Sequence, residues 1–125
     1  MIQKLEISGV HLKVDDKLRE YVTKKIGRLD QYMSRHSKAS VHVEVWLKEA
    51  KAKDKNISTC EVVIHMPHDT ITTKESTVNI YAAVDIVEAK LKNQVKRYKQ
   101  THEQPYRIHR RFMARLRRKA PVETL

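Results

Sequence analysis

Residues 79–98 read NIYAAVDIVEAKLKNQVKRY and carry the clearest periodic signal in this 125-residue chain. Apolar side chains recur every three or four positions from Tyr81 to Tyr98, a spacing that predicts one apolar stripe along a helix. Asn79 precedes the stripe, and asparagine is a residue type that caps helix N-termini. Lysine and arginine crowd the C-terminal half, where positive charge complements the helix dipole. The segment therefore predicts a long amphipathic helix with a basic outer side.

A second amphipathic segment lies nearer the N-terminus. Asp15 is placed to cap it, and four apolar residues from Leu18 to Leu29 follow at spacings of four, four and three. The pattern predicts a helix that runs to about Met33, with lysine and arginine on its exposed side.

The remaining signals are those of strands. Apolar and polar residues alternate over 5–9, 41–47 and 60–66, and residues 70–75 are rich in β-branched threonine. The lysine-rich run 48–56 is predicted to be an exposed hairpin connection, and Pro67 marks a turn. The element order is then β-α-β-β-β-α, an α+β fold with a four-stranded sheet and two helices packed on one face. Its last five elements follow the order of double-stranded-RNA-binding domains.

The charge is strongly positive and unevenly distributed. Lysine and arginine number 26 against 15 aspartate and glutamate residues, a net charge of +11, which favours a polyanionic partner. Residues 101–125 hold seven of these cations against two acidic residues, a net charge of +5. We therefore expect one folded domain over 1–100 and a basic tail over 101–125, disordered or partly helical until it meets RNA.

Other classes of protein lack support in the sequence. No apolar run approaches the roughly 20 residues that span a membrane, and the N-terminus does not resemble a signal peptide. The single cysteine, Cys60, fits a reducing cytoplasm. There is no glycine-rich phosphate loop, and nothing marks a nucleophile with its base. The seven histidines show no metal-ligand spacing. We therefore expect no enzyme activity, cofactor, metal or small-molecule substrate.

Two stretches resemble a known family. Residues 18–32, LREYVTKKIGRLDQY, resemble the first helix of the ribosome hibernation-promoting factor and ribosome-associated inhibitor A family. The start YAAVD at 81–85, followed by Lys90-Leu91, resembles its second helix. The resemblance covers about residues 1–100 and is to the short form, because long members add a C-terminal dimerisation domain for which 25 residues are too few.

The resemblance implies a cytoplasmic stress-response protein that binds the small ribosomal subunit and its ribosomal RNA. It implies a position in the decoding channel, where the protein blocks messenger RNA and also transfer RNA at the A and P sites. By matching position, the implied RNA contacts are Lys25, Arg28, Lys90 and Arg97. Location and charge add Lys92, Lys96 and Lys99 on the second helix and Arg110, Arg111, Arg115, Arg117 and Arg118 in the tail.

Some alternatives stay open at this point. A generic structured-RNA-binding or ribosome-assembly protein of the same fold would share the charge and the element order. Tyr81 and Tyr98 either stack on bases or pack in the core, and their place on the apolar stripe favours the core. Trp46 lies on the strand face opposite Val43 and Val45, where it is either an exposed stacking platform or a cover for lysine stems.

Overall fold

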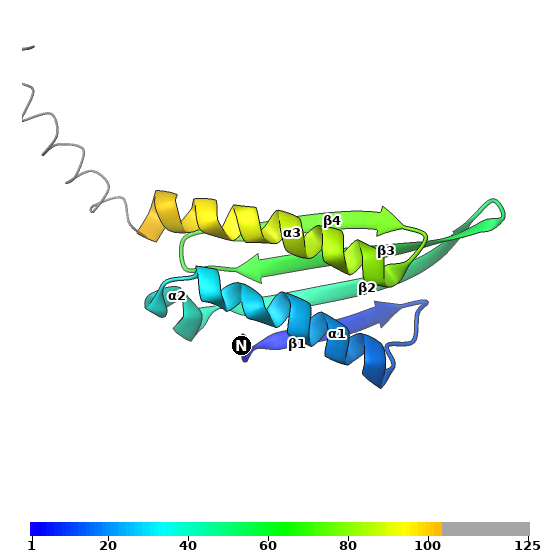
Figure 1. Ribbon diagram of the computed structural model, residues 1–125, viewed down its shortest axis with the longest axis horizontal. Helices are drawn as coiled ribbons and strands as arrows, with labels where there is room; N and C mark the ends of the chain where they lie inside the picture. Colours follow the sequence, from blue (N-terminus) through cyan, green and yellow to red (C-terminus); the bar gives the residue numbers. More distant parts are fainter. Residues whose placement is uncertain (104–125) are drawn as a thin grey trace, which may run out of the picture.

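The computed structural model describes residues 1–103, in which two long helices cover one face of a four-stranded sheet (Figure 1). The elements are β1 (Leu5–Val10), α1 (Asp16–Gly27), η1 (Arg28–Tyr32), α2 (Arg35–Ser40), β2 (His42–Ala52), β3 (Lys55–His65), β4 (Thr70–Thr77), α3 (Ile80–Tyr98) and η2 (Lys99–Glu103). The strand order is β1-β2-β3-β4, with β1 parallel to β2 and the other pairs antiparallel. The predicted α+β fold is confirmed.

The core lies between the sheet and the two helices. Val22 and Ile26 on α1, Val87 and Leu91 on α3, and Val45 on β2 are fully buried in one cluster. Alternation along each strand sends one set of side chains into this cluster and the other set to the opposite face of the sheet. Among residues 1–103, no helix is both long and apolar enough to cross a membrane.

Both long helices begin at the caps that the sequence predicts. The Asp15 carboxylate accepts a hydrogen bond from the backbone N–H of Leu18 at 2.8 Å. The Asn79 side-chain oxygen accepts one from the N–H of Tyr81, also at 2.8 Å. Each bond satisfies a donor that has no partner within the helix, which fixes where the helix starts.

The predicted end of the first helix at Met33 is wrong. The α-helix ends at Gly27, and the chain continues as a 3-10 turn over Arg28–Tyr32. The backbone N–H of Ile2 donates to the Gly27 carbonyl at 3.0 Å, so this oxygen already has a partner from outside the helix. Glycine also weakens a helix interior. A further short helix, α2, follows with Ser34 as its cap and was not predicted.

The predicted exposed hairpin is present, but the predicted extent of its connection, 48–56, is wrong. Strands β2 and β3 stay paired through this run to Ala52 and Lys55, so only Lys53 and Asp54 form the turn. Lys53 has a φ of 56°, in the left-handed region that tight turns use. The run is polar because the ladder extends beyond the cover of the helices, as Figure 1 shows, so neither face of the ribbon has a core to join.

Candidate nucleic-acid interface

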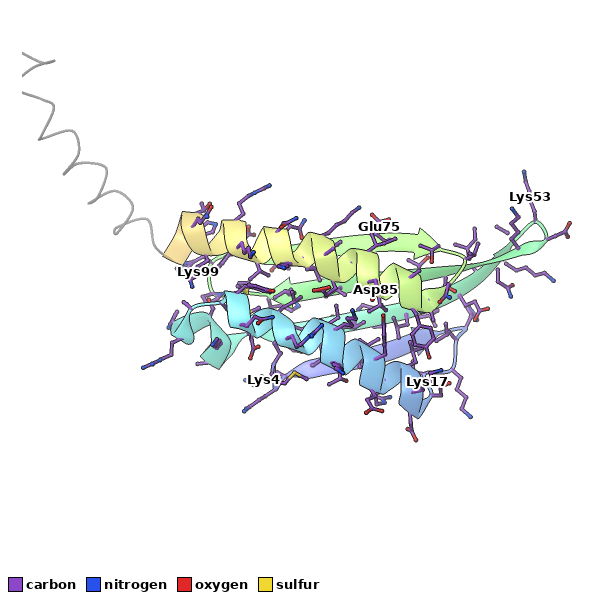
Figure 2. All side chains as sticks on the ribbon, viewed as in Figure 1. Lys4, Lys17, Lys53, Glu75, Asp85 and Lys99 are labelled. Atoms are coloured by element: carbon purple, nitrogen blue, oxygen red, sulfur yellow. The ribbon has the colours of Figure 1, made fainter. Side chains whose placement is uncertain are left out.

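Tyrosine and charged side chains line the junction between α1–η1 and α3. Residues three or four positions apart share one side of a helix, and the α1–η1 series faces the α3 series across the junction. Figure 2 shows Lys17 near the start of α1 and Asp85 between the two helices. We call the following set the helix seam: Lys17, Tyr21, Lys25, Arg28 and Tyr32 from α1–η1, and Tyr81, Asp85, Lys92 and Lys96 from α3.

One half of the helix seam is internally paired. The Tyr21 ring meets the Tyr81 ring edge-on, with centroids 5.0 Å apart, and its hydroxyl donates to the Asp85 carboxylate at 2.5 Å. The Lys25 ammonium lies 3.5 Å from the same carboxylate oxygen. The hydrogen bond to Asp85, with smaller effects from burial and nearby charges, raises the pKa of Tyr21 to about 12. Tyr21 therefore stays a donor at neutral pH, and the Asp85 charge is balanced by Lys25.

The other half of the helix seam presents cations without acidic partners. The ammonium groups of Lys92 and Lys96 lie 5.3 and 5.0 Å from the centre of the Tyr32 ring. Arg28 is exposed at the C-terminus of α1. Within residues 1–103, none of these three cations forms an ion pair. A cation–π contact at an exposed site contributes about 0.5–1 kcal/mol, which orients the lysines and leaves their charge available to a phosphate.

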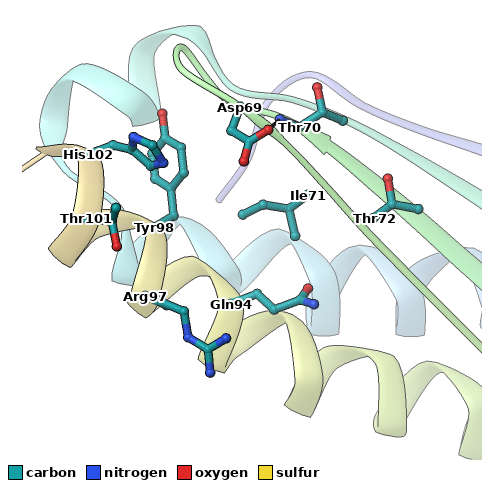
Figure 3. Close-up of a pocket in the computed structure, with 9 residues that line it drawn as sticks. All are labelled: Asp69, Thr70, Ile71, Thr72, Gln94, Arg97, Tyr98, Thr101 and His102. Carbon is teal, nitrogen blue, oxygen red and sulfur yellow. Dashed lines mark hydrogen bonds between the residues drawn. The ribbon is translucent and has the colours of Figure 1, made fainter.

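Two of the expected contact residues lie on the other side of α3, towards β4. Lys90 forms an ion pair with Glu75 of β4. Arg97 borders a shallow hollow of about 350 Å³ between the start of β4 and the end of α3, with Gln94 and Tyr98 among its neighbours (Figure 3). Thr73 of β4 donates to the Gln94 side chain at 2.6 Å and ties this side of α3 to the sheet. Lys90 and Arg97 therefore belong to a different surface from Lys25 and Arg28.

The last expected positions fall at the C-terminal end of α3 and beyond. Lys99 is half-buried in η2, directly after α3, as Figure 2 shows. The tail arginines lie outside the described residues, namely Arg110, Arg111, Arg115, Arg117 and Arg118. The expected boundary at residue 100 falls within η2, which runs to Glu103.

The aromatic residues divide between core and surface. Tyr98 is buried, and its hydroxyl accepts a hydrogen bond from the backbone N–H of His68 at 2.9 Å, so it packs in the core. Tyr81 is half-buried against the same core and against Tyr21. Trp46 is half-buried on the sheet face that the helices leave open. The ring that Lys92 and Lys96 contact in the basic half is that of Tyr32, and not that of any of these three residues.

Sequence reasoning missed Tyr32 and Tyr21 as members of the site. The available signal was the spacing of four residues from Lys17 to Tyr21 and from Tyr21 to Lys25. That spacing places Tyr21 and these two cations on one side of α1. It did not reveal that α3 would lie against this side.

Cys60, the chain's single thiol, is buried on the helix-facing side of β3. Burial, with a smaller effect from Glu61, raises the pKa of the Cys60 thiol to about 12. A thiol that stays protonated at neutral pH is a poor nucleophile. Cys60 therefore serves as a small apolar core residue.

Comparison with known proteins points in one direction. Residues 5–103 match the model of the family described as Sigma 54 modulation protein / S30EA ribosomal protein. Over 96 residues the chain is 32% identical to a curated protein of Staphylococcus aureus (strain COL) named ribosome hibernation promotion factor, a match that covers 77% of this chain and 48% of that protein. The chain thus spans about half the length of this relative.

Two solved structures share the fold. The N-terminal domain of Thermus thermophilus Protein Y matches with a TM-score of 0.62 and 32% identity, over 78% of this chain and 97% of that one. A ribosomal subunit interface protein from Coxiella burnetii also gives a TM-score of 0.62, at 20% identity, over 76% of this chain and 96% of that one. At 20% identity the second likeness concerns the fold alone.

Proposed function

Because this chain belongs to the Sigma 54 modulation protein / S30EA ribosomal protein family, we propose that it is a ribosome hibernation factor that arrests translation by occupying the ribosome. The family membership confirms the resemblance expected from the two helix motifs. The name of the Staphylococcus aureus relative supports the proposed role. A ribosomal partner also places the protein in the cytoplasm.

The observation that carries the proposal is the basic half of the helix seam. Lys92 and Lys96 lie over the Tyr32 ring, and Arg28 is exposed where α1 ends; none of the three forms an ion pair among the described residues. Ribosomal RNA offers closely spaced phosphates, and each phosphate that a cation neutralises releases condensed counterions. Two packed helices that present several cations together obtain the favourable free energy of counterion release at several phosphates. They do so without the entropy cost of ordering a flexible segment.

The site that we propose on the ribosome is the decoding channel of the small subunit. A protein lodged there excludes messenger RNA and also transfer RNA from the A and P sites by occupying their space. Such a mechanism requires binding and no bond making. It rests on the family resemblance together with the basic helix seam.

The tail supplies a second, less specific part of the proposed contact. Its arginines have the planar fork that matches phosphate oxygens in pairs. We assign to this role Arg110, Arg111, Arg115, Arg117 and Arg118. In this arrangement the folded domain sets the location, and the tail adds phosphate contacts.

An order-of-addition experiment tests the blocking mechanism. The full chain is bound to vacant ribosomes, messenger RNA and P-site transfer RNA are then added, and each component is followed by sedimentation. We expect the bound chain to exclude both RNAs, and pre-bound RNAs to exclude the chain. Simultaneous binding of all three would refute blocking, and sedimentation with precursor subunits alone would favour a ribosome-assembly role.

A further inference from the structure

The face of the sheet opposite the helices carries its own group of side chains. On β2, His42 and Glu44 point away from the core, because they alternate with the buried Val43 and Val45. Figure 1 shows α1 and α3 on the other face of the sheet. Both outward side chains are half-buried by their neighbours on the sheet alone.

The strand register brings histidine and glutamate side chains together on this face. His42 on β2 pairs directly with His65 on β3, and Glu44 on β2 pairs with Glu6 on β1. The two imidazole rings stack with centroids 5.4 Å apart and an angle of 28° between their planes. We call Glu6, His42, Glu44 and His65 the three-strand cluster.

The ligand atoms of the three-strand cluster converge. His65 Nε2 lies 3.2 Å from Glu44 Oε1, and one ligand atom from each of these residues and from His42 lies within 4.8 Å of the others. His42 Nε2 is also 3.6 Å from Glu6 Oε1. Two imidazoles and the Glu44 carboxylate are thus gathered on strands β2 and β3, and the Glu6 carboxylate of β1 lies beside one of the imidazoles.

We propose that the three-strand cluster binds a divalent transition-metal ion, and that zinc suits it well. Imidazole nitrogen and carboxylate oxygen are ordinary zinc ligands, and four of them complete a tetrahedral site. At zinc–ligand distances of about 2.0–2.1 Å, neighbouring ligand atoms lie about 3.3 Å apart. The present separations require small side-chain rotations. The Glu6 side chain, 72% exposed, is free to make the largest one.

A metal-free alternative uses the same residues. His65–Glu44 and His42–Glu6 would be two surface ion pairs, each of which requires a protonated imidazole. Metal binding requires the imidazoles to be neutral, so its affinity rises with pH, whereas the ion pairs strengthen as pH falls. Zinc affinity that falls between pH 7.5 and pH 5.5 would therefore support the metal site over the two ion pairs.

A bound ion would add a further link between three neighbouring strands. Glu6 lies on β1, which is an edge of the sheet, and the other three ligands lie on β2 and β3. An ion that binds the folded chain and not the unfolded chain stabilises the fold by an amount that grows with the logarithm of its concentration once that concentration exceeds Kd. The unfolding temperature should therefore rise with zinc concentration.

Calorimetric titration of the full chain with zinc chloride at pH 7.5 tests the proposal. We expect one equivalent to bind, with weaker binding at pH 5.5, and a higher Tm in its presence. The double variant H42Q/H65Q should lose affinity by about 10-fold or more, together with the Tm shift. Circular dichroism without metal shows whether each variant folds, which is expected because these side chains lie outside the core.

The matched control is the other stacked histidine pair, His68 and His102. Its rings lie 5.9 Å apart at 22°, and within residues 1–103 it belongs to no cluster of metal-ligating side chains. The double variant H68Q/H102Q should bind zinc as the wild type does. Absence of zinc binding by the wild type, equal binding by H42Q/H65Q, or equal loss in the two double variants would overturn the proposal.

Discussion

Removing the three unpaired cations of the helix seam should weaken ribosome binding and make it less sensitive to salt. The variant carries Arg28→Gln, Lys92→Gln and Lys96→Gln, none of which belongs to the buried core. Each lost phosphate contact lowers the slope of log affinity against log salt by about 0.7–0.9, so three contacts lower it by about 2–3. Raising salt fourfold, from about 50 to 200 mM, should then weaken the wild type about 20- to 40-fold more than the variant.

Fluorescence anisotropy of the labelled chain with vacant ribosomes at several salt concentrations measures this difference. The matched control carries Lys51→Gln, Lys53→Gln and Lys55→Gln at the β2–β3 turn, where Figure 2 places Lys53 far from the helix seam. It loses the same net charge. An unchanged slope in the helix-seam variant, or an equal drop in the turn variant, would show that global charge and not the helix seam governs binding.

Three further predictions concern the phenol, the core and the tail. Asp85→Asn should lower the Tyr21 pKa from about 12 towards 10, seen as an earlier ultraviolet titration against a Tyr21→Phe reference. Because folding raises this pKa, the wild type should lose the corresponding stability as pH rises from 10 to 12, and the Tyr21→Phe variant should not. Leu91→Ala should lower the free energy of unfolding in urea by about 2–5 kcal/mol, since Leu91 is fully buried; a loss below about 1 kcal/mol would contradict its core role. Deleting residues 104–125 should flatten the salt dependence of ribosome binding, and an unchanged slope would remove the tail from the RNA contact.

The parts of the fold that the sequence predicts are those determined within a single helix or strand, by its apolar pattern or by its capping residue. The stripe from Tyr81 to Tyr98 and the caps Asp15 and Asn79 depend on residues close in sequence, and all three are confirmed. The end of α1 escaped prediction because it depends on Ile2, whose backbone bonds to a carbonyl 25 positions later. The extent of the β2–β3 hairpin was not predicted, because its outer part lies beyond the core. Backbone pairing there requires no alternation of apolar residues, so the sequence carries no strand signal.

The site was harder to predict than the fold. Lys90 and Lys92 are two positions apart and carry the same charge, yet Lys90 contacts β4 and Lys92 lies over Tyr32 of η1. Which lysine faces which neighbour depends on how α3 packs against β4 and η1, and the charge pattern does not predict this packing. The histidines show the same limit, because His42 and His65 are 23 positions apart in sequence and become direct neighbours only through strand pairing.

The helix seam and the three-strand cluster lie on opposite sides of the sheet, so their charges should act independently. The helix axes lie about 10 Å from the sheet, and the outer surface of a helix lies about 5 Å farther from it. The Debye length at physiological salt is about 8 Å, shorter than this separation. Saturating zinc should therefore leave the ribosome affinity of the full chain within about twofold, well below the roughly tenfold that 1.4 kcal/mol would give. A larger change in the wild type that is absent from H42Q/H65Q would mean that the metal reshapes the helix layer or itself contacts the ribosome.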